Sequence, residues 1–197
     1  MQTQKSKQFL VRVLKSNSTG TKPCQAASGF VACLILLLAV PLTLRAEVFF
    51  ARATSVPDGD TLWVQPEAGG GTRKLRLQGI DAPEICQSAG VTARDALRAL
   101  VADKRLQVTV KYQDDYGRGL ARITVEGRDV GAALVQQGQA WSDRWRRSLG
   151  PYAQQESEAR QAGRGLFAQA DAELPRDFRK RFGSCYVADA EGVLHLR

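Results

Sequence analysis

Alternating apolar and polar residues predict five β-strands in this chain. In one stretch, Leu75, Leu77 and Gly79 share a face, while Arg76 and Gln78 lie on the other. The same alternation, or a high content of β-branched and aromatic residues, marks four more segments. The predicted strands are residues 48–56, 61–65, 73–79, 105–112 and 118–125.

Three later segments show helical patterns instead. Leu97 and Val101 belong to one apolar face, Gly138 supplies a C-terminal cap, and Pro151 fits a first helical turn. The predicted helices are residues 89–102, 129–137 and 151–161. Because the strands mostly come first, the pattern predicts an α+β fold with a mostly β core, a small barrel with packed helices. The charged segment from Asp171 onward shows no period and is predicted to be irregular.

The first 46 residues predict an export leader. An apolar run at 29–44 follows a basic segment, and its sixteen residues are short for a membrane-spanning helix. Cleavage is expected before Glu47, and the alternative is an uncleaved membrane anchor through 29–44. The chain then divides into a leader at 1–46, one domain at 47–170 and a tail at 171–197. We expect the protein to be exported to the periplasm or medium.

Net charge alone suggests a polyanionic partner, but its distribution weakens that argument. The formal net charge is +8 and the pI is about 9.6. Residues 1–46 hold six basic residues and no acid, which leaves 22 basic and 20 acidic residues in the remainder. Nucleic-acid binding must therefore be argued from local clusters.

The cysteine pattern fits an exported protein. Cys24 and Cys33 lie in the leader, and the remainder keeps Cys86 and Cys185 without a C-x-x-C spacing, which disfavours a zinc site. In an oxidising compartment the latter two can pair and tie the tail to the turn before Cys86. Two free thiols are the alternative.

The sequence offers few kinds of side chain for catalysis or metal binding. His195 is the one histidine of the sequence, and it lies near the end of the chain. Histidine-based triads and histidine metal sites are therefore excluded, and no P-loop or dinucleotide fingerprint occurs. Carboxylates, arginines and backbone groups remain, and oxygen-only ligation favours Ca²⁺ or Mg²⁺ over zinc.

The stretch from Leu75 to Glu84 combines these groups. A strand that carries Arg76 runs into a turn with Asp81 and Glu84. Such a set suits a phosphate ester, because the arginine can hold an anion and the acids can hold a hard cation or activate water. Two further turns carry similar groups, and an ordinary hairpin turn is the alternative for each. They hold Asp58 and Asp60 in the first turn, and Tyr116 and Arg118 in the second.

Four segments, taken together and in order, resemble the staphylococcal nuclease-like, or thermonuclease, family. They are Asp58 to Thr61, Arg76 to Glu84, Asp114 to Gly119 and Val130 to Gly138. The resemblance covers roughly residues 48–167. It implies an OB-type five-stranded Greek-key barrel with three packed helices. It also implies Ca²⁺ as cofactor, in preference to Mg²⁺, and DNA or RNA as substrate.

The resemblance implies a role for each motif residue. Asp60 and Asp81 match the metal carboxylates, and Ala82 replaces a threonine that contributes its backbone carbonyl. Glu84 matches the general base, and Arg76 and Arg118 match the phosphate clamps. Asp58 would be an outer-shell carboxylate and Tyr116 an aromatic near the bound nucleotide.

The chain departs from the family pattern around the nucleotide. Asp115 stands where a nucleotide-binding lysine is found, and the tyrosine pair that packs on the base is not matched. Trp141, Arg144 and Trp145 occupy that region and are predicted to supply stacking and cation contacts. A solvated face with two core tryptophans is the alternative.

The predicted function is a Ca²⁺-dependent phosphodiesterase that cleaves DNA or RNA by in-line water attack and leaves 3′-phosphate ends. The protein is expected to be a monomer, and no protein partner is implied. One alternative is a non-catalytic OB module that binds single-stranded nucleic acid, which would not need the acids and arginines together. A second is a membrane-tethered structural protein that retains its leader.

Overall fold

The computed structural model describes residues 46–144, 146–169 and 171–197. The predicted leader, with its apolar run at 29–44, lies outside the described residues, as does Trp145. Within the described ranges, no helix has both the length and the apolar character needed to cross a membrane.

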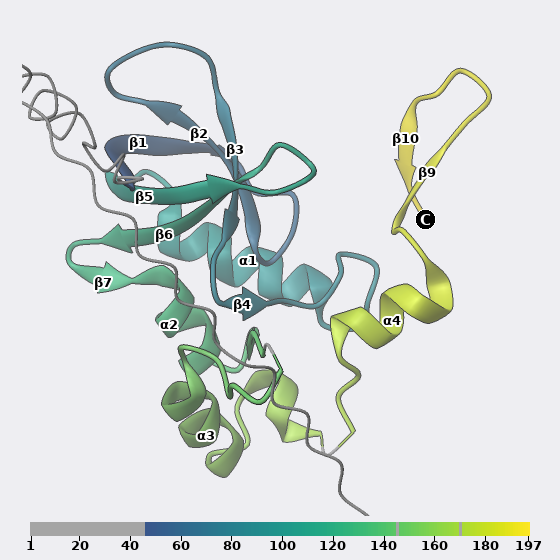
Figure 1. Cartoon of the computed structure of the whole chain (residues 1–197). Helices are drawn as coiled ribbons and strands as arrows, with labels where there is room; N and C mark the ends of the chain where they lie inside the picture. Colours follow the sequence, from purple (N-terminus) through teal and green to yellow (C-terminus); the bar gives the residue numbers. More distant parts are fainter. Residues whose placement is uncertain (1–45, 145, 170) are drawn as a thin grey trace, which may run out of the picture. The chain divides into compact units, whose positions relative to one another are not determined.

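Five strands form a closed barrel. The strand order is β3-β2-β1-β5-β6, and a parallel pairing of β3 with β6 closes the ring. The other barrel pairings are antiparallel, and Figure 1 shows the strands wrapping around a common interior. The strands are β1 (Glu47–Ser55), β2 (Thr61–Pro66), β3 (Arg73–Leu77), β5 (Leu106–Gln113) and β6 (Gly119–Val125). The five predicted strands and the OB-type fold are thereby confirmed.

The alternation of apolar and polar side chains along β3 determines that Arg76 faces the site. Leu75 and Leu77 point into the barrel core with 0% and 2% of their surface exposed. Arg76 between them therefore points outward, because successive side chains of a strand lie on opposite faces. Burial of the two leucines holds the strand register and with it the position of the guanidinium.

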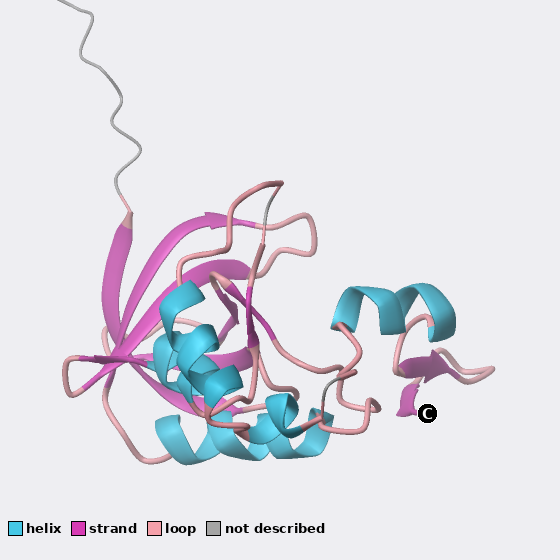
Figure 2. Cartoon of the chain, turned by 90° about the horizontal axis from the view of Figure 1, so that it is seen from below, coloured by secondary structure: helices cyan, strands magenta, loops and turns pink. Residues whose placement is uncertain are grey.

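The three predicted helices are present, and they pack beside the barrel (Figure 2). On the first of them, Ala93, Leu97 and Val101 are fully buried, as a 3.6-residue period requires. On the second, the side chain of Asp129 caps the helix by accepting a hydrogen bond from the Ala132 N–H. The helices are α1 (Gly90–Val101), α2 (Val130–Gln136) and α3 (Ala153–Gln161), and the 3₁₀ turn η1 (Gly165–Ala168) follows.

Short strands link the barrel to the helical part. β4 (Ile80–Asp81) pairs antiparallel with β8 (Trp141–Ser142), and β7 (Arg128–Asp129) pairs with β6 just before α2. The β4–β8 pair attaches the segment that carries Asp81 to the chain between α2 and α3.

The tail forms a helix and two strands, so the prediction of an irregular segment after Asp171 is wrong. It forms α4 (Pro175–Phe182), β9 (Tyr186–Ala188) and β10 (Leu194–Leu196), and the two strands pair as a hairpin. Gly183 ends α4 with a φ of 72°, a conformation that favours glycine. The helical pattern was hard to see because most of the helix is charged and exposed. Its apolar signal is only Phe178 and Phe182, whose ring centroids lie 4.8 Å apart.

Candidate active site

A pocket of about 730 Å³ opens where the β1–β2 turn, β3, the turn after β4 and the β5–β6 turn meet. The tail supplies a further wall through Arg179, Gly183 and Ser184. Most residues predicted for the site line this pocket. They are Asp58, Asp60, Arg76, Ala82, Glu84, Tyr116 and Arg118.

The β1–β2 turn holds two carboxylates close together. Asp58 accepts hydrogen bonds from the backbone N–H groups of Asp60 at 3.1 Å and Thr61 at 2.7 Å. The turn passes so near its neighbours that a Cβ on Gly59 would lie 2.7 Å from the Cβ of Ala93. Burial, and then repulsion from Asp60, raise the pKa of Asp58 to about 6. The turn thus concentrates negative charge at a place that suits a cation.

Arg76 joins the two predicted metal carboxylates. Its Nη1 donates to Asp60 at 2.7 Å and its Nη2 donates to Asp81 at 3.1 Å. Burial opposes the charged guanidinium, but the two carboxylates outweigh it and raise the pKa of Arg76 above its ordinary value. One guanidinium therefore brings Asp60 and Asp81 together from the ends of different strands.

The turn after β4 completes this group. The backbone N–H of Ala82 donates to the second oxygen of Asp60 at 3.2 Å. Burial, and then repulsion from Asp60, raise the pKa of Asp81, although Arg76 and Arg179 act in the other direction. The Asp60 carboxylate has only 6% of its side chain exposed, so this polar cluster is largely shielded from water.

Glu84 is held through its backbone as well as its side chain. Its N–H donates to the side-chain oxygen of Gln87 at 3.1 Å. Its carbonyl oxygen packs directly on Gly90 at the start of α1, where a Cβ would overlap it. Its carboxylate forms an ion pair with Arg179 of α4. These contacts aim the carboxylate into the pocket.

We expect Gly90→Ala to destabilise the protein by roughly 1–3 kcal/mol, because the added methyl overlaps the Glu84 carbonyl oxygen. The higher helix propensity of alanine, about 1 kcal/mol at most, acts in the opposite direction and is too small to compensate. Urea denaturation measures the change. Gly71→Ala is the matched control, since nothing lies within 4 Å of a Cβ there, and an equal loss in both variants would contradict the prediction.

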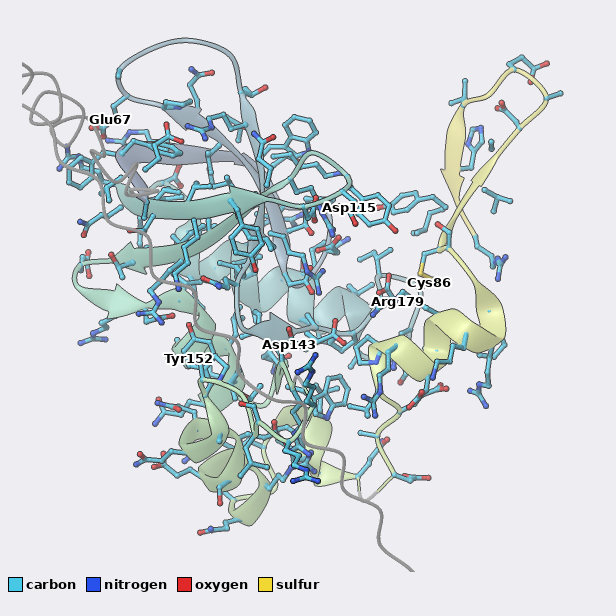
Figure 3. The ribbon with its side chains drawn as sticks, in the orientation of Figure 1. Glu67, Cys86, Asp115, Asp143, Tyr152 and Arg179 are labelled. Atoms are coloured by element: carbon cyan, nitrogen blue, oxygen red, sulfur yellow. A yellow bond between two sulfur atoms is a disulfide. The ribbon has the colours of Figure 1, made fainter. Side chains whose placement is uncertain are left out.

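Arg118 is oriented by its own turn. Its Nε donates to Asp114 at 2.8 Å, and Asp114 also accepts from the backbone N–H groups of Tyr116 and Arg118. These hydrogen bonds outweigh burial and lower the pKa of Asp114. The Tyr116 ring is 84% exposed, and the Arg118 guanidinium lies 5.3 Å from its centroid. Figure 3 labels Asp115, the neighbour of Tyr116 in this turn, together with Arg179 of α4.

The predicted stacking residues are placed elsewhere. Trp141 is only 4% exposed and packs edge-on against Phe167 at 6.2 Å, so its faces are not free to stack on a base, contrary to prediction. Arg144 donates to the buried carboxylate of Glu156 at 2.7 Å, which gives it a structural partner. Neither residue lines the pocket.

The structure pairs Cys86 with Cys185, with a Cα–Cα distance of 5.5 Å across 99 positions of sequence. The predicted disulfide is confirmed, and it places the tail beside the turn that carries Glu84. Lys74, Asp114 and Arg179 belong to the site but were not predicted. For Arg179 the signal was the basic run at 176–181 close to a cysteine that could pair with Cys86.

The oxygen atoms gathered at this site are of the kind that binds a hard cation. Two carboxylates, Asp60 and Asp81, lie within reach of a single guanidinium, and the Ala82 backbone adjoins them. Oxygen donors of this kind suit Ca²⁺ or Mg²⁺. Among the described residues no group of three or more histidine, cysteine or acidic side chains is arranged for a metal, so such a site would draw on backbone and substrate oxygens.

A closed OB barrel with arginines and carboxylates gathered in one pocket fits an enzyme that acts on a phosphate ester, because the arginines can hold the anion and the acids can hold a cation or activate water. Comparison with known proteins makes this specific. Residues 74–169 match the family described as staphylococcal nuclease homologue.

Among similar curated proteins, an uncharacterized endonuclease of Haemophilus influenzae is 30% identical over 148 residues, 75% of this chain and 83% of that protein. A micrococcal nuclease of Shigella flexneri is 31% identical over 168 residues, 79% of this chain and 92% of the relative. Protein ParB of Escherichia coli is 35% identical over 169 residues, which cover 78% and 89% of the two chains. The chain belongs to the staphylococcal nuclease family, and this membership supports nuclease activity on nucleic acid.

Proposed function

We propose that this nuclease is a Ca²⁺-dependent phosphodiesterase that hydrolyses DNA or RNA by in-line attack of water and leaves 3′-phosphate ends. The observation that carries the proposal is the single pocket lined by Asp60, Arg76, Glu84 and Arg118. A module that only binds single strands would have no use for two acids, Asp60 and Asp81, paired with Arg76 in the same site as Arg118. The 3′-phosphate product is supported by the family resemblance alone.

In the proposed mechanism Glu84 accepts a proton from the attacking water and orients it toward phosphorus. Arg76 and Arg118 donate to the phosphate oxygens on which negative charge increases in the transition state. Both guanidiniums are pre-oriented by carboxylates, Arg76 by Asp60 and Asp81 and Arg118 by Asp114. Little reorganisation is then needed when the substrate binds.

Asp60, Asp81 and the carbonyl of Ala82 would hold the cation, and Asp58 would support them through the N–H groups of Asp60 and Thr61. A Ca²⁺ held there would supply positive charge that offsets the negative charge increasing on the phosphate during hydrolysis. Ca²⁺ is preferred to Mg²⁺ because the set mixes carboxylate and carbonyl oxygens and because the family resemblance implies Ca²⁺.

The test is digestion of single- and double-stranded DNA and RNA with Ca²⁺, with Mg²⁺ and with a chelator. We expect cleavage with Ca²⁺, weaker cleavage with Mg²⁺ and none with the chelator, and end-labelling should reveal 3′-phosphates. Asp81→Ala provides the matched loss-of-metal variant, and Asp95→Ala, on the exposed side of α1, is its control. Cleavage that persists in the chelator would refute the metal dependence, and binding without cleavage under every condition would favour the OB binding module.

We also propose that the protein is exported and monomeric, with the leader removed before Glu47. The disulfide between Cys86 and Cys185 supports export, because such bonds persist in oxidising compartments. Amino-terminal sequencing of the mature protein checks the cleavage, and recovery of the whole chain in membranes would favour a retained anchor instead.

A further inference from the structure

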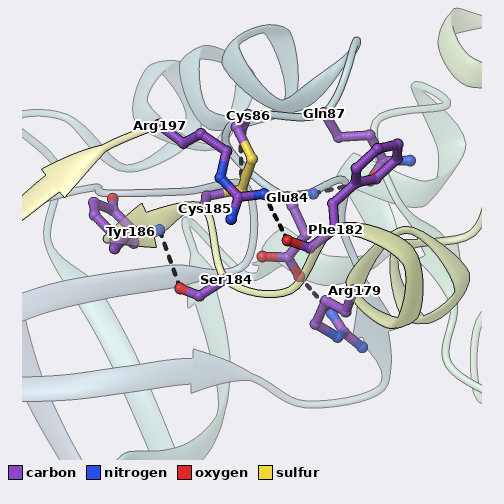
Figure 4. Close-up of a disulfide and its surroundings, with 9 residues drawn as sticks. All are labelled: Glu84, Cys86, Gln87, Arg179, Phe182, Ser184, Cys185, Tyr186 and Arg197. Carbon is purple, nitrogen blue, oxygen red and sulfur yellow. Dashed lines mark hydrogen bonds and ion pairs between the residues drawn. A yellow bond between two sulfur atoms is a disulfide. The ribbon is translucent and has the colours of Figure 1, made fainter. Parts of the chain in front are cut away.

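The tail is fastened to the turn that carries Glu84 at three successive points. Arg179 pairs with the Glu84 carboxylate, Cys185 is bonded to Cys86, and the side chain of Gln87 donates to the Glu173 carbonyl at 2.6 Å. Figure 4 shows the disulfide beside Glu84 and Arg179. One contact lies before α4, one is on the helix and one follows it, so the helix has a defined position against the pocket.

The contacts of the Arg179 guanidinium use only part of its N–H donors. Its contacts with Glu84 and, at 3.7 Å, with Asp81 both use Nη1. Within the described ranges no hydrogen bond is recorded from its Nη2 or Nε. The side chain is 42% exposed and lines the pocket. A guanidinium offers five N–H donors in a fixed fork, so this one can bind an anion while it stays beside Glu84.

Arg179 also adds positive charge to the pocket. The lining itself carries three acids, Asp58, Asp60 and Glu84, and four cations, Lys74, Arg76, Arg118 and Arg179. Asp81 and Asp114, which pair with Arg76 and Arg118, offset the cations of the lining. Arg179 therefore reduces the repulsion that these acids exert on a phosphodiester anion.

We propose that Arg179 is a third phosphate-binding arginine of this nuclease, which holds a backbone phosphate next to the scissile one and is kept in place by the Cys86–Cys185 disulfide. The inference rests on the proposed function, in which Arg76 and Arg118 serve the scissile phosphate. Arg179 approaches from a different wall of the pocket and from an element outside the family match at 74–169, so it can hold a neighbouring phosphate while Arg76 and Arg118 hold the scissile one.

The opposite assignment would make Arg179 an inhibitory latch on Glu84. The geometry does not favour it, because the pocket keeps a volume of about 730 Å³ with the pair formed, and the Glu84 side chain is still 27% exposed. The two assignments predict opposite signs. Loss of a phosphate contact weakens substrate binding, whereas loss of a latch increases turnover.

The first experiment compares kinetics on a single-stranded oligonucleotide and on a dinucleoside monophosphate, which has only the scissile phosphate. Arg179→Ala should raise KM for the oligonucleotide roughly 10- to 100-fold and leave KM for the short substrate nearly unchanged. Arg179→Lys should recover part of the loss, because lysine keeps the charge without the fork. Arg176→Ala is the matched control, since that residue lies on the same helix, is 61% exposed and pairs with Asp177.

The second experiment measures binding without cleavage in the Glu84→Gln background, by fluorescence polarisation of a labelled single strand at several salt concentrations. Adding Arg179→Ala should weaken binding and reduce the slope of log K against log salt by roughly 0.7, the value for one phosphate contact on a single strand. In the Cys86→Ser/Cys185→Ser variant, Arg179→Ala should have a smaller effect, because the tail is no longer held.

An unchanged KM and an unchanged salt slope in Arg179→Ala would overturn the inference, as would faster turnover, which would identify a latch. An equal effect on both substrates would also overturn it, because the contact would then be to the scissile phosphate. These outcomes differ from a failure of the proposed function, in which the wild-type protein itself would not cleave.

Discussion

Replacing Glu84 with glutamine should lower kcat about 10²- to 10⁴-fold without weakening the binding of nucleic acid. Glutamine has the same shape but cannot accept the proton of the attacking water. The fold should tolerate the change, since the ion pair that is lost to Arg179 is partly exposed and such pairs contribute about 0–1 kcal/mol. Single-turnover cleavage and oligonucleotide binding measure the two quantities separately.

Glu67→Gln is the matched control for this substitution. Glu67 pairs with Arg105 and does not line the pocket. Its replacement by glutamine therefore removes one carboxylate charge at a position outside the active site. We expect that variant to cleave as fast as the wild-type protein. A Glu84→Gln variant with near-normal kcat would show that another group activates the water.

Replacing Arg118 with alanine should reduce kcat roughly 10²- to 10³-fold, as expected when one donor to the transition-state charge is removed. The loss also leaves Asp114 without its partner at 2.8 Å, which adds negative charge beside the phosphate. Binding should weaken much less than turnover, because the charge on the equatorial oxygens increases only as the bond breaks. Rates and dissociation constants on the same oligonucleotide measure the difference.

Two further variants define what Arg118 contributes. Arg118→Lys should fall between the wild-type protein and Arg118→Ala, because lysine keeps the charge but cannot present a planar fork. Arg122→Ala removes an arginine from β6, the strand that directly follows Arg118; its side chain is 56% exposed and paired with Asp129, and its loss should change kcat little. Equal effects of Arg118→Ala and Arg122→Ala would point to general electrostatics rather than a specific clamp.

The strand pattern predicted the barrel well because alternation is local. Leu75 and Leu77 must be buried whatever the rest of the chain does, and Arg76 must then face outward. The spacing of Asp58, Asp60 and Asp81 along the chain identified the motifs. Asp60 and Asp81 meet around Arg76 because β2 pairs with β3 and places Thr61 opposite Arg76. Barrel closure through β3 and β6 adds Arg118 to the same pocket, and no local pattern encodes that closure.

The structure gives some residues of the predicted nucleotide contact partners that the sequence pattern did not reveal. Arg144 was predicted to supply a cation contact, but the fold buries Glu156, with 2% of its surface exposed, and Arg144 and Arg160 both bind it. A buried carboxylate needs such partners, because an unpaired charge in the interior is costly. Trp141 likewise lies in the core, because the β8 strand that carries it pairs with β4.

The sequence alone thus determined the strands, the acids and arginines of the motifs, the family and the two cysteines that can pair. Only the tertiary structure decided that the tail forms a helix and that Arg179 lies against Glu84. The reason is physical: periodicity and turn signals act over a few residues, whereas a contact across 95 positions exists only once the barrel has closed and the Cys86–Cys185 bond has brought the tail back to the site.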